Sequence, residues 1–247
     1  MIDTAEKGFL SLQLEVQKDG GHSSMPEKET AIDILSNGLA KLRGAAFKGR
    51  LAPAQQDFVR YIGPELPFIK RMAFANTWLF ENVIIKEYEK TSTGNALMRA
   101  TLVPTILRAG IKDNIVPSAA TAIINIRLFS GDSAGLVAEK VKNIINDLRV
   151  KVSMVDKFEA SATTPVNSDA FKRVEISARK TFPNTIIAPF LLIAGTDSHH
   201  FQQLAKHIIR FTPAIDPQNF HGVNERVSLR SYQLSLWFYE QLLRSEI

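Results

Sequence analysis

Cysteine is absent from the 247-residue sequence. The absence excludes disulfides, thiolate metal ligands and cysteine nucleophiles together. A zinc ion, if the chain binds one, must therefore use histidines and carboxylates.

Long apolar runs are also lacking, because no stretch approaches the roughly 20 residues that a membrane helix needs. The start, MIDTAEKGFLSLQLEV, has no basic-then-apolar signal pattern. Lys and Arg outnumber Asp and Glu by 30 to 25, but the basic residues are scattered and form no run of three. We therefore expect neither a membrane nor a nucleic acid as a partner, and a cytoplasmic location is favoured.

Local zinc motifs are a third absence. None of the five histidines lies in an HxD or HExxH pattern, and the sequence has no Glu-Glu pair. A hydrolytic metal site would have to be assembled from distant parts of the chain.

The hydrophobic pattern of the first two thirds predicts a complete α+β domain. Phe9–Val16 alternates apolar and polar residues, as a half-buried strand does, and 27–42 has helical spacing with Pro26 suited to the first turn. The aromatic-rich stretch 52–90 predicts two or three short helices. The remaining elements are strands at about 97–107, 120–129 and 150–156 and a helix capped by Ser133. This β-α-insert-β-β-α-β order is a split βαβ arrangement of the ferredoxin-like kind.

The last third of the sequence has a different hydrophobic pattern, which predicts part of an α/β domain. A helix from Ser168 to about Phe182 precedes the continuous apolar strand IIAPFLLIA and a short strand, HIIRF. Continuous apolar strands are typical of sheets covered on both faces. The last predicted helix carries apolar side chains on one face, namely Leu229, Tyr232, Leu236, Tyr239 and Leu243.

GTDSHH is one candidate site, because an apolar strand ends at Ala194 and delivers Gly195, Thr196 and His199 to its carboxyl end. Open α/β sheets bind their ligands there. Asp197 and its neighbouring serine also suit a simple helix cap. The residues alone leave the two interpretations equal.

Two further polar segments fall in predicted turns. GHSSMP holds His22 between a strand and a helix, where a solvated loop is the plainer interpretation. Asn114 precedes a strand that points Arg127 away from its apolar face; an arginine fork suits a carboxylate, but a surface arginine fits equally. His207 lies within a predicted strand and is interpreted as structural.

Five segments, taken in order, resemble one family: AEKGFLSLQLEV, GGHSSMPEKETAIDIL, IKDNIVPSAATAIINIRLFSGDS, GTDSHHF and FHGVNERVSLRSY. They look like the dinuclear-zinc aminoacylase and carboxypeptidase family, most closely its carboxypeptidase S and Gly-X carboxypeptidase branch. The resemblance implies a ferredoxin-like lid, or dimerisation, domain at 8–155 with a helical insert at about 45–95. Residues 1–7 and 156–247 would then be part of an α/β catalytic domain, and the chain would form a homodimer through the lid.

The resemblance also implies roles for single residues. His221 would be a zinc ligand, and His22 would reach the partner subunit's active site and stabilise the oxyanion. Asn114 and Arg127 would contact the substrate, as would Gly195, Thr196 and His199. Many members of the family have an arginine where this chain has His199, and a neutral imidazole cannot form the same bidentate clamp.

By the same resemblance, the complete enzyme hydrolyses the amide bond of peptides or N-acyl amino acids, using two zinc ions and a bridging water. The other ligands and the general-base glutamate would precede the AEKG segment, so the sequence as given is expected to be inactive alone. A non-catalytic dimerisation or binding module, or an inactive fragment, is the competing interpretation.

Overall fold

The structure is a computed structural model that describes residues 1–45 and 47–245. The chain forms two compact units. Unit 1 consists of Met1–Glu6, Leu51–Ile84 and Ala162–Ile247, and unit 2 consists of Lys7–Arg50 and Ile85–Ser161.

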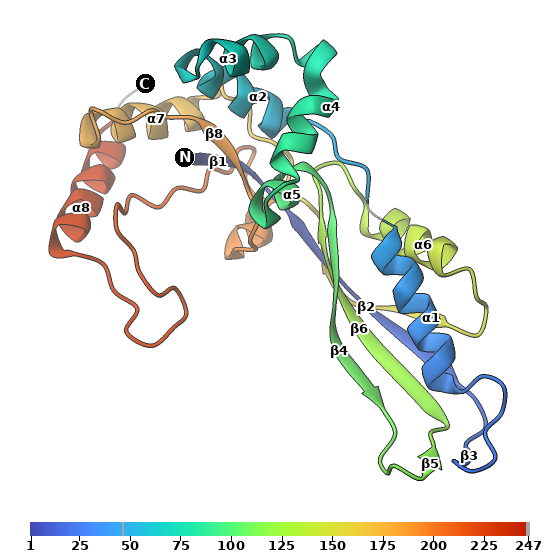
Figure 1. Ribbon diagram of the computed structural model, residues 1–247. Helices are drawn as coiled ribbons and strands as arrows, with labels where there is room; N and C mark the ends of the chain where they lie inside the picture. The colour runs from blue at the N-terminus through green and yellow to red at the C-terminus, as the bar shows by residue number, and fades with distance from the viewer. Residues whose placement is uncertain (46, 246–247) are drawn as a thin grey trace. The chain divides into compact units, whose positions relative to one another are not determined.

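Unit 2 is built on a four-stranded antiparallel sheet in the order β4-β6-β2-β7 (Figure 1). Its strands are β2 (Gly8–Gln17), β4 (Thr101–Ala109), β6 (Ala119–Leu128) and β7 (Lys151–Phe158). The two central strands pair over their full length, from Gly8 opposite Leu128 to Gln17 opposite Ala119. This strand order is that of the ferredoxin-like split βαβ arrangement, so the predicted topology is confirmed.

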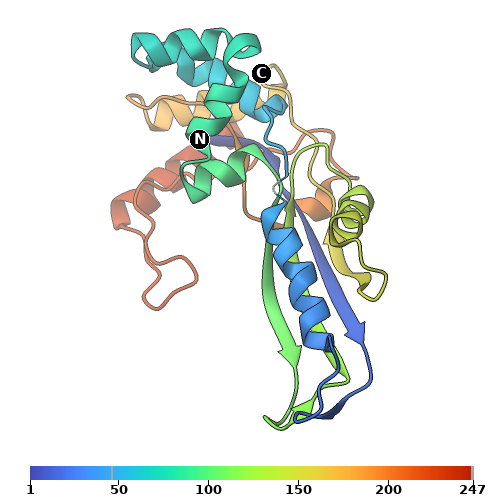
Figure 2. The same cartoon turned by 45° about the vertical axis from the view of Figure 1, so that its right-hand side comes forward.

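One face of this sheet is apolar and covered by two helices, α1 (Ala31–Gly44) and α6 (Ala134–Ile145). Figure 2 shows α1 lying along the sheet. The alternation in β2 explains the covering, because every second side chain points to the helices. These side chains are fully buried: Leu10, Leu12, Leu14 and Val16.

The helix predicted at 27–42 begins later, at Ala31. Thr30 and Asp33 form a capping box, in which each side chain accepts a hydrogen bond from the other residue's backbone N–H. This cap fixes the start of α1 and leaves Pro26 outside the helix.

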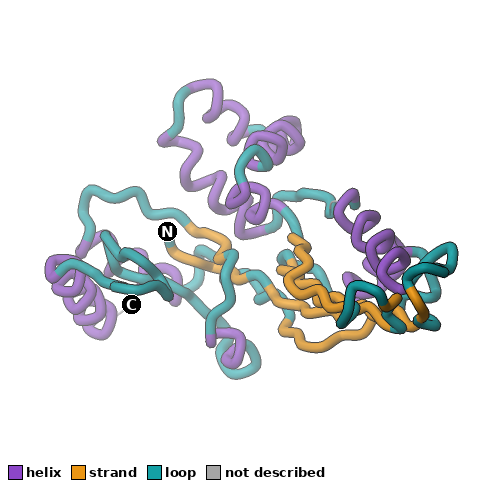
Figure 3. The backbone as a smooth tube through the Cα atoms, turned by 60° about the horizontal axis from the view of Figure 1, so that its bottom comes forward, coloured by secondary structure: helices purple, strands orange, loops and turns teal. Residues whose placement is uncertain are grey.

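The stretch 52–90 holds three short α-helices, as predicted: α2 (Pro53–Ile62), α3 (Phe68–Ala75) and α4 (Thr77–Tyr88), with a 3-10 turn at Gly63–Glu65. The insert ends with one further helix, α5 (Ser92–Met98). Figure 3 shows the backbone with its helices in purple and its strands in orange. Most of this insert, Leu51–Ile84, belongs to unit 1. The compact units are therefore divided differently from the predicted domains, whose functional division stays a prediction.

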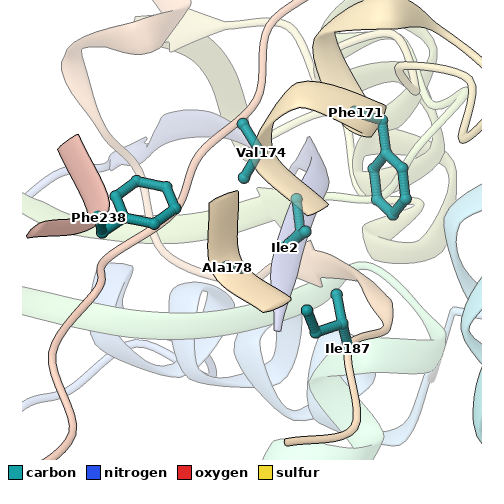
Figure 4. Packing of buried hydrophobic residues seen from close by; sticks show 6 residues of the cluster. All are labelled: Ile2, Phe171, Val174, Ala178, Ile187 and Phe238. Atoms are coloured by element: carbon teal, nitrogen blue, oxygen red, sulfur yellow. The ribbon is translucent and has the colours of Figure 1, made fainter. Parts of the chain in front are cut away.

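Unit 1 has a short parallel strand pair, β1 (Ile2–Glu6) with β8 (Pro189–Leu192). The helices α7 (Asp169–Thr181) and α8 (Leu229–Arg244) pack against each other in the same unit. Figure 4 shows a core of apolar side chains from these elements and from the segment before β8: Ile2, Phe171, Val174, Ala178, Ile187 and Phe238.

Three predictions for unit 1 need correction. The apolar run IIAPFLLIA is a strand only over Pro189–Leu192, because β1 is the one strand that pairs with it in the described part of the chain. HIIRF forms only an isolated bridge between Arg210 and Asp3. The predicted apolar face of α8 is exposed, and the helix instead buries Ser231 and Phe238.

No helix in the described ranges is long and apolar enough to cross a membrane.

Candidate functional site

His22 and Asn114 are brought together in unit 2 by a small two-stranded arm. The strands β3 (Gly21–His22) and β5 (Ile115–Val116) pair so that His22 lies opposite Ile115, the residue after Asn114. The backbone N–H of Ser23 donates to the Asn114 carbonyl at 3.2 Å. Two segments that are distant in the sequence therefore lie side by side in the arm.

The hydrogen bonds of His22 define its tautomer. The backbone N–H of Ser24 donates to Nδ1 of His22 at 3.2 Å, and the Ser24 hydroxyl lies 2.8 Å from the same nitrogen. A backbone N–H can only donate, so Nδ1 carries a lone pair and the ring proton of the neutral imidazole is on Nε2. His22 therefore offers an N–H donor from an exposed position.

Arg127 lies elsewhere in unit 2. It is opposite Phe9 in the sheet and stacks on the Phe9 ring, with 5.4 Å between the guanidinium carbon and the ring centroid. The arm follows the other ends of the same strands, about 26 Å away at the usual rise per residue. Within one chain, Arg127 and the pair His22 and Asn114 are thus not parts of one site.

Gly195 and Thr196 lie in unit 1, in the loop after β8. A buried glutamate, Glu6, holds this loop by hydrogen bonds. The carboxylate of Glu6, at the end of β1, accepts from both the backbone N–H and the hydroxyl of Thr196 and from the Ser198 hydroxyl. The loop continues into a 3-10 turn at Asp197–Phe201. Glu6 is 1% exposed, so these donors replace the water that its charge has lost.

Arg210 is the cation beside Glu6. Its Nε donates to the Glu6 carboxylate and to the Ser198 hydroxyl, both at 2.6 Å. The pair is nearly inaccessible, with side chains 8% and 1% exposed. Sequence reasoning missed both residues, because the pair joins residues 204 positions apart and no local pattern marks it.

The ring of His199 has the opposite hydrogen-bonding role at Nδ1 from that of His22. Its Nδ1 lies 2.6 Å from the carbonyl of Thr196, which can only accept, so Nδ1 carries the proton. Its ring also lies against that of His200, with centroids 3.9 Å apart. In the neutral form, Nε2 of His199 is an acceptor and does not suit a carboxylate ligand.

His221 is exposed in the loop before α8, with a left-handed backbone at φ 58°. Its backbone N–H donates to Glu225 at 3.2 Å, and Asn219 and Asn224 are also left-handed. Non-glycine residues held in this region are uncommon and often occur at functional sites. The loop presents the imidazole to solvent.

The described residues do not fit a zinc centre by themselves. They contain no group of three or more His, Asp or Glu side chains that could hold a metal ion. A zinc site needs about four ligands, and His221 supplies at most one.

One buried group in each unit, Asp3 in unit 1 and Lys7 in unit 2, has a shifted pKa. Burial raises the pKa of Asp3 from 3.8 to about 6, against the opposing charges of the N-terminus and Arg210. Burial lowers the pKa of Lys7 from 10.5 to about 8, with a smaller contribution from the charge of Arg127. The Lys7 amine donates to the carbonyls of Ala96 and Arg99, at 2.9 and 2.7 Å, and so caps the C-terminal end of α5.

Comparison with known proteins gives matches along the whole chain. A family model described as a peptidase dimerisation domain matches residues 4–152. A probable carboxypeptidase S-like protein 2 of Dictyostelium discoideum is 34% identical over 99% of this chain and 48% of its own length. The N-fatty-acyl-amino acid synthase/hydrolase PM20D1 of Xenopus tropicalis is 33% identical over 99% of this chain and 49% of its own.

Solved structures agree on the fold. An M20 family metallo-carboxypeptidase from Sulfolobus solfataricus superposes with a TM-score of 0.68 at 17% identity, covering 98% of this chain and 59% of its own. Human carnosine dipeptidase 1 gives a TM-score of 0.63 at 14% identity over 99% of this chain and 56% of its own. The chain spans about half the length of the curated relatives it matches.

Proposed function

The chain belongs to the M20 peptidase family, and from this membership we propose that it supplies the dimerisation domain and part of the catalytic domain of a zinc-dependent hydrolase. The reaction is hydrolysis of the amide bond of a peptide or an N-acyl amino acid. The observation that carries this proposal is the similarity over 99% of the chain to relatives named as carboxypeptidase S-like and as an N-fatty-acyl-amino acid synthase/hydrolase.

In this function, His22 and Asn114 act on the substrate from the arm of unit 2. The protonated Nε2 of His22 supports a role as donor to the oxyanion that forms when the scissile carbonyl is attacked. The pairing of β3 with β5 fixes Asn114 next to His22, so both side chains can act on the same substrate molecule. As His22 is proposed to act on the partner subunit's active site, the function requires a dimer.

Unit 1 contributes the loop after β8 and the loop of His221. Gly195, Thr196 and His199 are proposed to line the substrate site, and the contacts of Thr196 with Glu6 hold that loop in place. Arg127 is proposed as a further substrate contact. His221 is proposed as a ligand of the zinc ion. Its left-handed backbone and its exposure support this role, because they leave the imidazole accessible to a metal ion.

A chimera tests this proposal. The 247-residue chain replaces the matching segment of the Dictyostelium relative, and zinc content and hydrolysis of an N-acyl amino acid are measured for the chimera and for the chain alone. We expect turnover and bound zinc in the chimera only, because the chain's described residues form no metal centre.

His221→Ala in the chimera should remove zinc and turnover, and His207→Ala serves as the matched control that should keep both. Stoichiometric zinc and turnover in the chain alone, both lost in His221→Ala, would show that the site is built in another way. Full zinc content in the His221→Ala chimera would remove His221 from the ligand set.

A further inference from the structure

The guanidinium of Arg210 is hydrogen-bonded at one of its three nitrogens. Its Nε donates to Glu6 and Ser198, but the outer nitrogens Nη1 and Nη2 have no hydrogen-bond partner in the part of the chain that the structure describes. Both nitrogens are buried, and the whole side chain is 8% exposed. The two groups hold four N–H donors.

Such an arrangement is unfavourable for stability alone. A buried donor that has lost water and gained no partner carries its full desolvation penalty, and a charged donor carries more than a neutral one. One carboxylate, that of Glu6, already neutralises the positive charge, yet it uses only the Nε side of the group. The fold therefore holds a guanidinium in position whose two outer nitrogens have no hydrogen-bond partner among the described residues.

The chemistry of the fork selects an anion with two coplanar oxygens. Parallel N–H groups of an arginine bind carboxylates and phosphates in a bidentate manner. The neighbouring charges favour the carboxylate. Glu6 lies 2.6 Å from Nε and Asp3 bridges to Arg210 through the backbone, so a dianionic phosphate would meet more repulsion than a singly charged carboxylate.

The position of Arg210 connects the fork to the loop after β8. Ser198, which accepts from Nε, belongs to the 3-10 turn Asp197–Phe201, and Thr196 shares the Glu6 carboxylate with it. Because the Ser198 hydroxyl and the Glu6 carboxylate join the guanidinium to this turn, we expect binding at Arg210 to shift the signals of Thr196 as well.

We propose that Arg210, held in place by Glu6, is the carboxylate-binding residue of this loop and that its ligand is the free carboxylate of an N-acyl amino acid or peptide. The identity of the ligand rests on the proposed function, whereas the anion site itself rests on the geometry of Arg210. The arginine fork then supplies at this loop the bidentate contact that the imidazole of His199 cannot make.

Binding by the 247-residue chain tests this without any turnover. Arginine side chains labelled with ¹⁵N are observed by NMR while N-acetylglycine is added to about 20 mM, well above a dissociation constant of about 1 mM. We expect shifts of the Arg210 Nε and Nη signals and of the Thr196 amide. N-acetylglycinamide, which lacks the carboxylate, should leave all of them unchanged.

Arg210→Lys should weaken binding of N-acetylglycine at least tenfold, since lysine keeps the charge and loses the fork. Arg179→Lys, which changes an exposed arginine paired with Glu175, is the matched control and should bind as the wild type does. The wild-type titration decides the matter even if Arg210→Lys fails to fold.

Three results would overturn the proposal: Arg210 signals that do not move with N-acetylglycine, equal shifts with the amide, or equal shifts with inorganic phosphate at the same concentration. Because no step of the assay involves hydrolysis, an inactive chimera with intact N-acetylglycine binding would count against the proposed function and leave the Arg210 site standing.

Discussion

At the scale of single residues, His22 and His199 show how one hydrogen bond decides what a histidine can do. His22 accepts at Nδ1 and keeps a proton on Nε2, while His199 donates at Nδ1 to a carbonyl. Neutral His22 is thus a donor at its outer nitrogen and neutral His199 is an acceptor. Only the first suits an oxyanion.

His22→Ala in the active chimera should lower kcat by roughly two to three decades, because an oxyanion donor acts on the transition state more than on substrate affinity. KM should change far less. Steady-state kinetics on an N-acyl amino acid measure both. Ser24→Ala is the control: it keeps the backbone N–H that fixes the tautomer and should change kcat only slightly. An unchanged kcat in His22→Ala would make GHSSMP a solvated loop.

The buried carboxylate of Asp3 should lower the free energy of unfolding at neutral pH, where it is ionised. Its pKa is raised to about 6 in the fold from 3.8, so between these values the folded state binds the proton and the unfolded state does not, and stability falls as pH rises. Asp3→Asn should therefore be no more stable than wild type near pH 4 and more stable above pH 6, by up to about 3 kcal/mol.

Urea unfolding at the two pH values measures this difference, and Asp19→Asn, at an exposed position, is the control. A stability gain of equal size at both pH values would show that the effect of Asp3→Asn is unrelated to its ionisation.

The sequence could suggest some of the site residues and not others. His22 and Asn114 lie in turn-forming segments between predicted elements, and such segments can be recognised from the local sequence. Glu6 and Arg210 could not be recognised in this way, because they pair across 204 positions and their burial leaves no mark in the local sequence. The relation of His221 to other ligands is likewise a matter of tertiary structure.

At the scale of elements, prediction succeeded where one face alone was apolar. The alternation in β2 and β6 placed each strand correctly, because one side of the sheet packs on α1 and α6. The apolar run of β8 and the helix α8 have apolar residues on several sides. Their sequences therefore could not show that only four residues of the run form a strand or that Phe238, rather than Leu236 or Tyr239, enters the core.

Thr30→Ala should destabilise the chain by about 1 kcal/mol, because it removes the capping box at the start of α1. The expected measurement is a lower urea midpoint for unfolding of unit 2, with an unchanged dependence on urea concentration. Thr30→Ser keeps the hydroxyl and should retain most of the stability. Equal losses in the two variants would assign the effect to the threonine methyl group and not to the cap.

At the scale of the whole molecule, β4 is the edge through which we expect a homodimer. It lies at the end of the sheet in unit 2 and carries exposed apolar side chains, among them Val103 and Leu107 at 53% and 65%. An edge of this kind readily pairs with a second chain, and a two-fold axis would close the assembly. The match to a peptidase dimerisation domain supports this expectation.

Light scattering at tens of micromolar should give the mass of a dimer. Leu107→Lys should shift the chain to monomer, because a charged side chain on an edge strand opposes pairing. Val155→Lys makes a similar change on β7, the other edge, where Val155 is 59% exposed, and should leave the dimer intact. A wild-type monomer, or dissociation by the β7 variant alone, would contradict pairing through β4.

The separated stretches of unit 1 have a consequence for the order of folding. Ile2 pairs with Pro189, and all of unit 2 lies between them in the sequence. Closing so long a loop from an unfolded chain is entropically costly, whereas a folded unit 2 shortens the span that remains disordered. Backbone amides of β2 and β6 should therefore become protected from hydrogen exchange during refolding before those of β1 and β8, so that unit 1 is completed last although it contains the first residues of the chain.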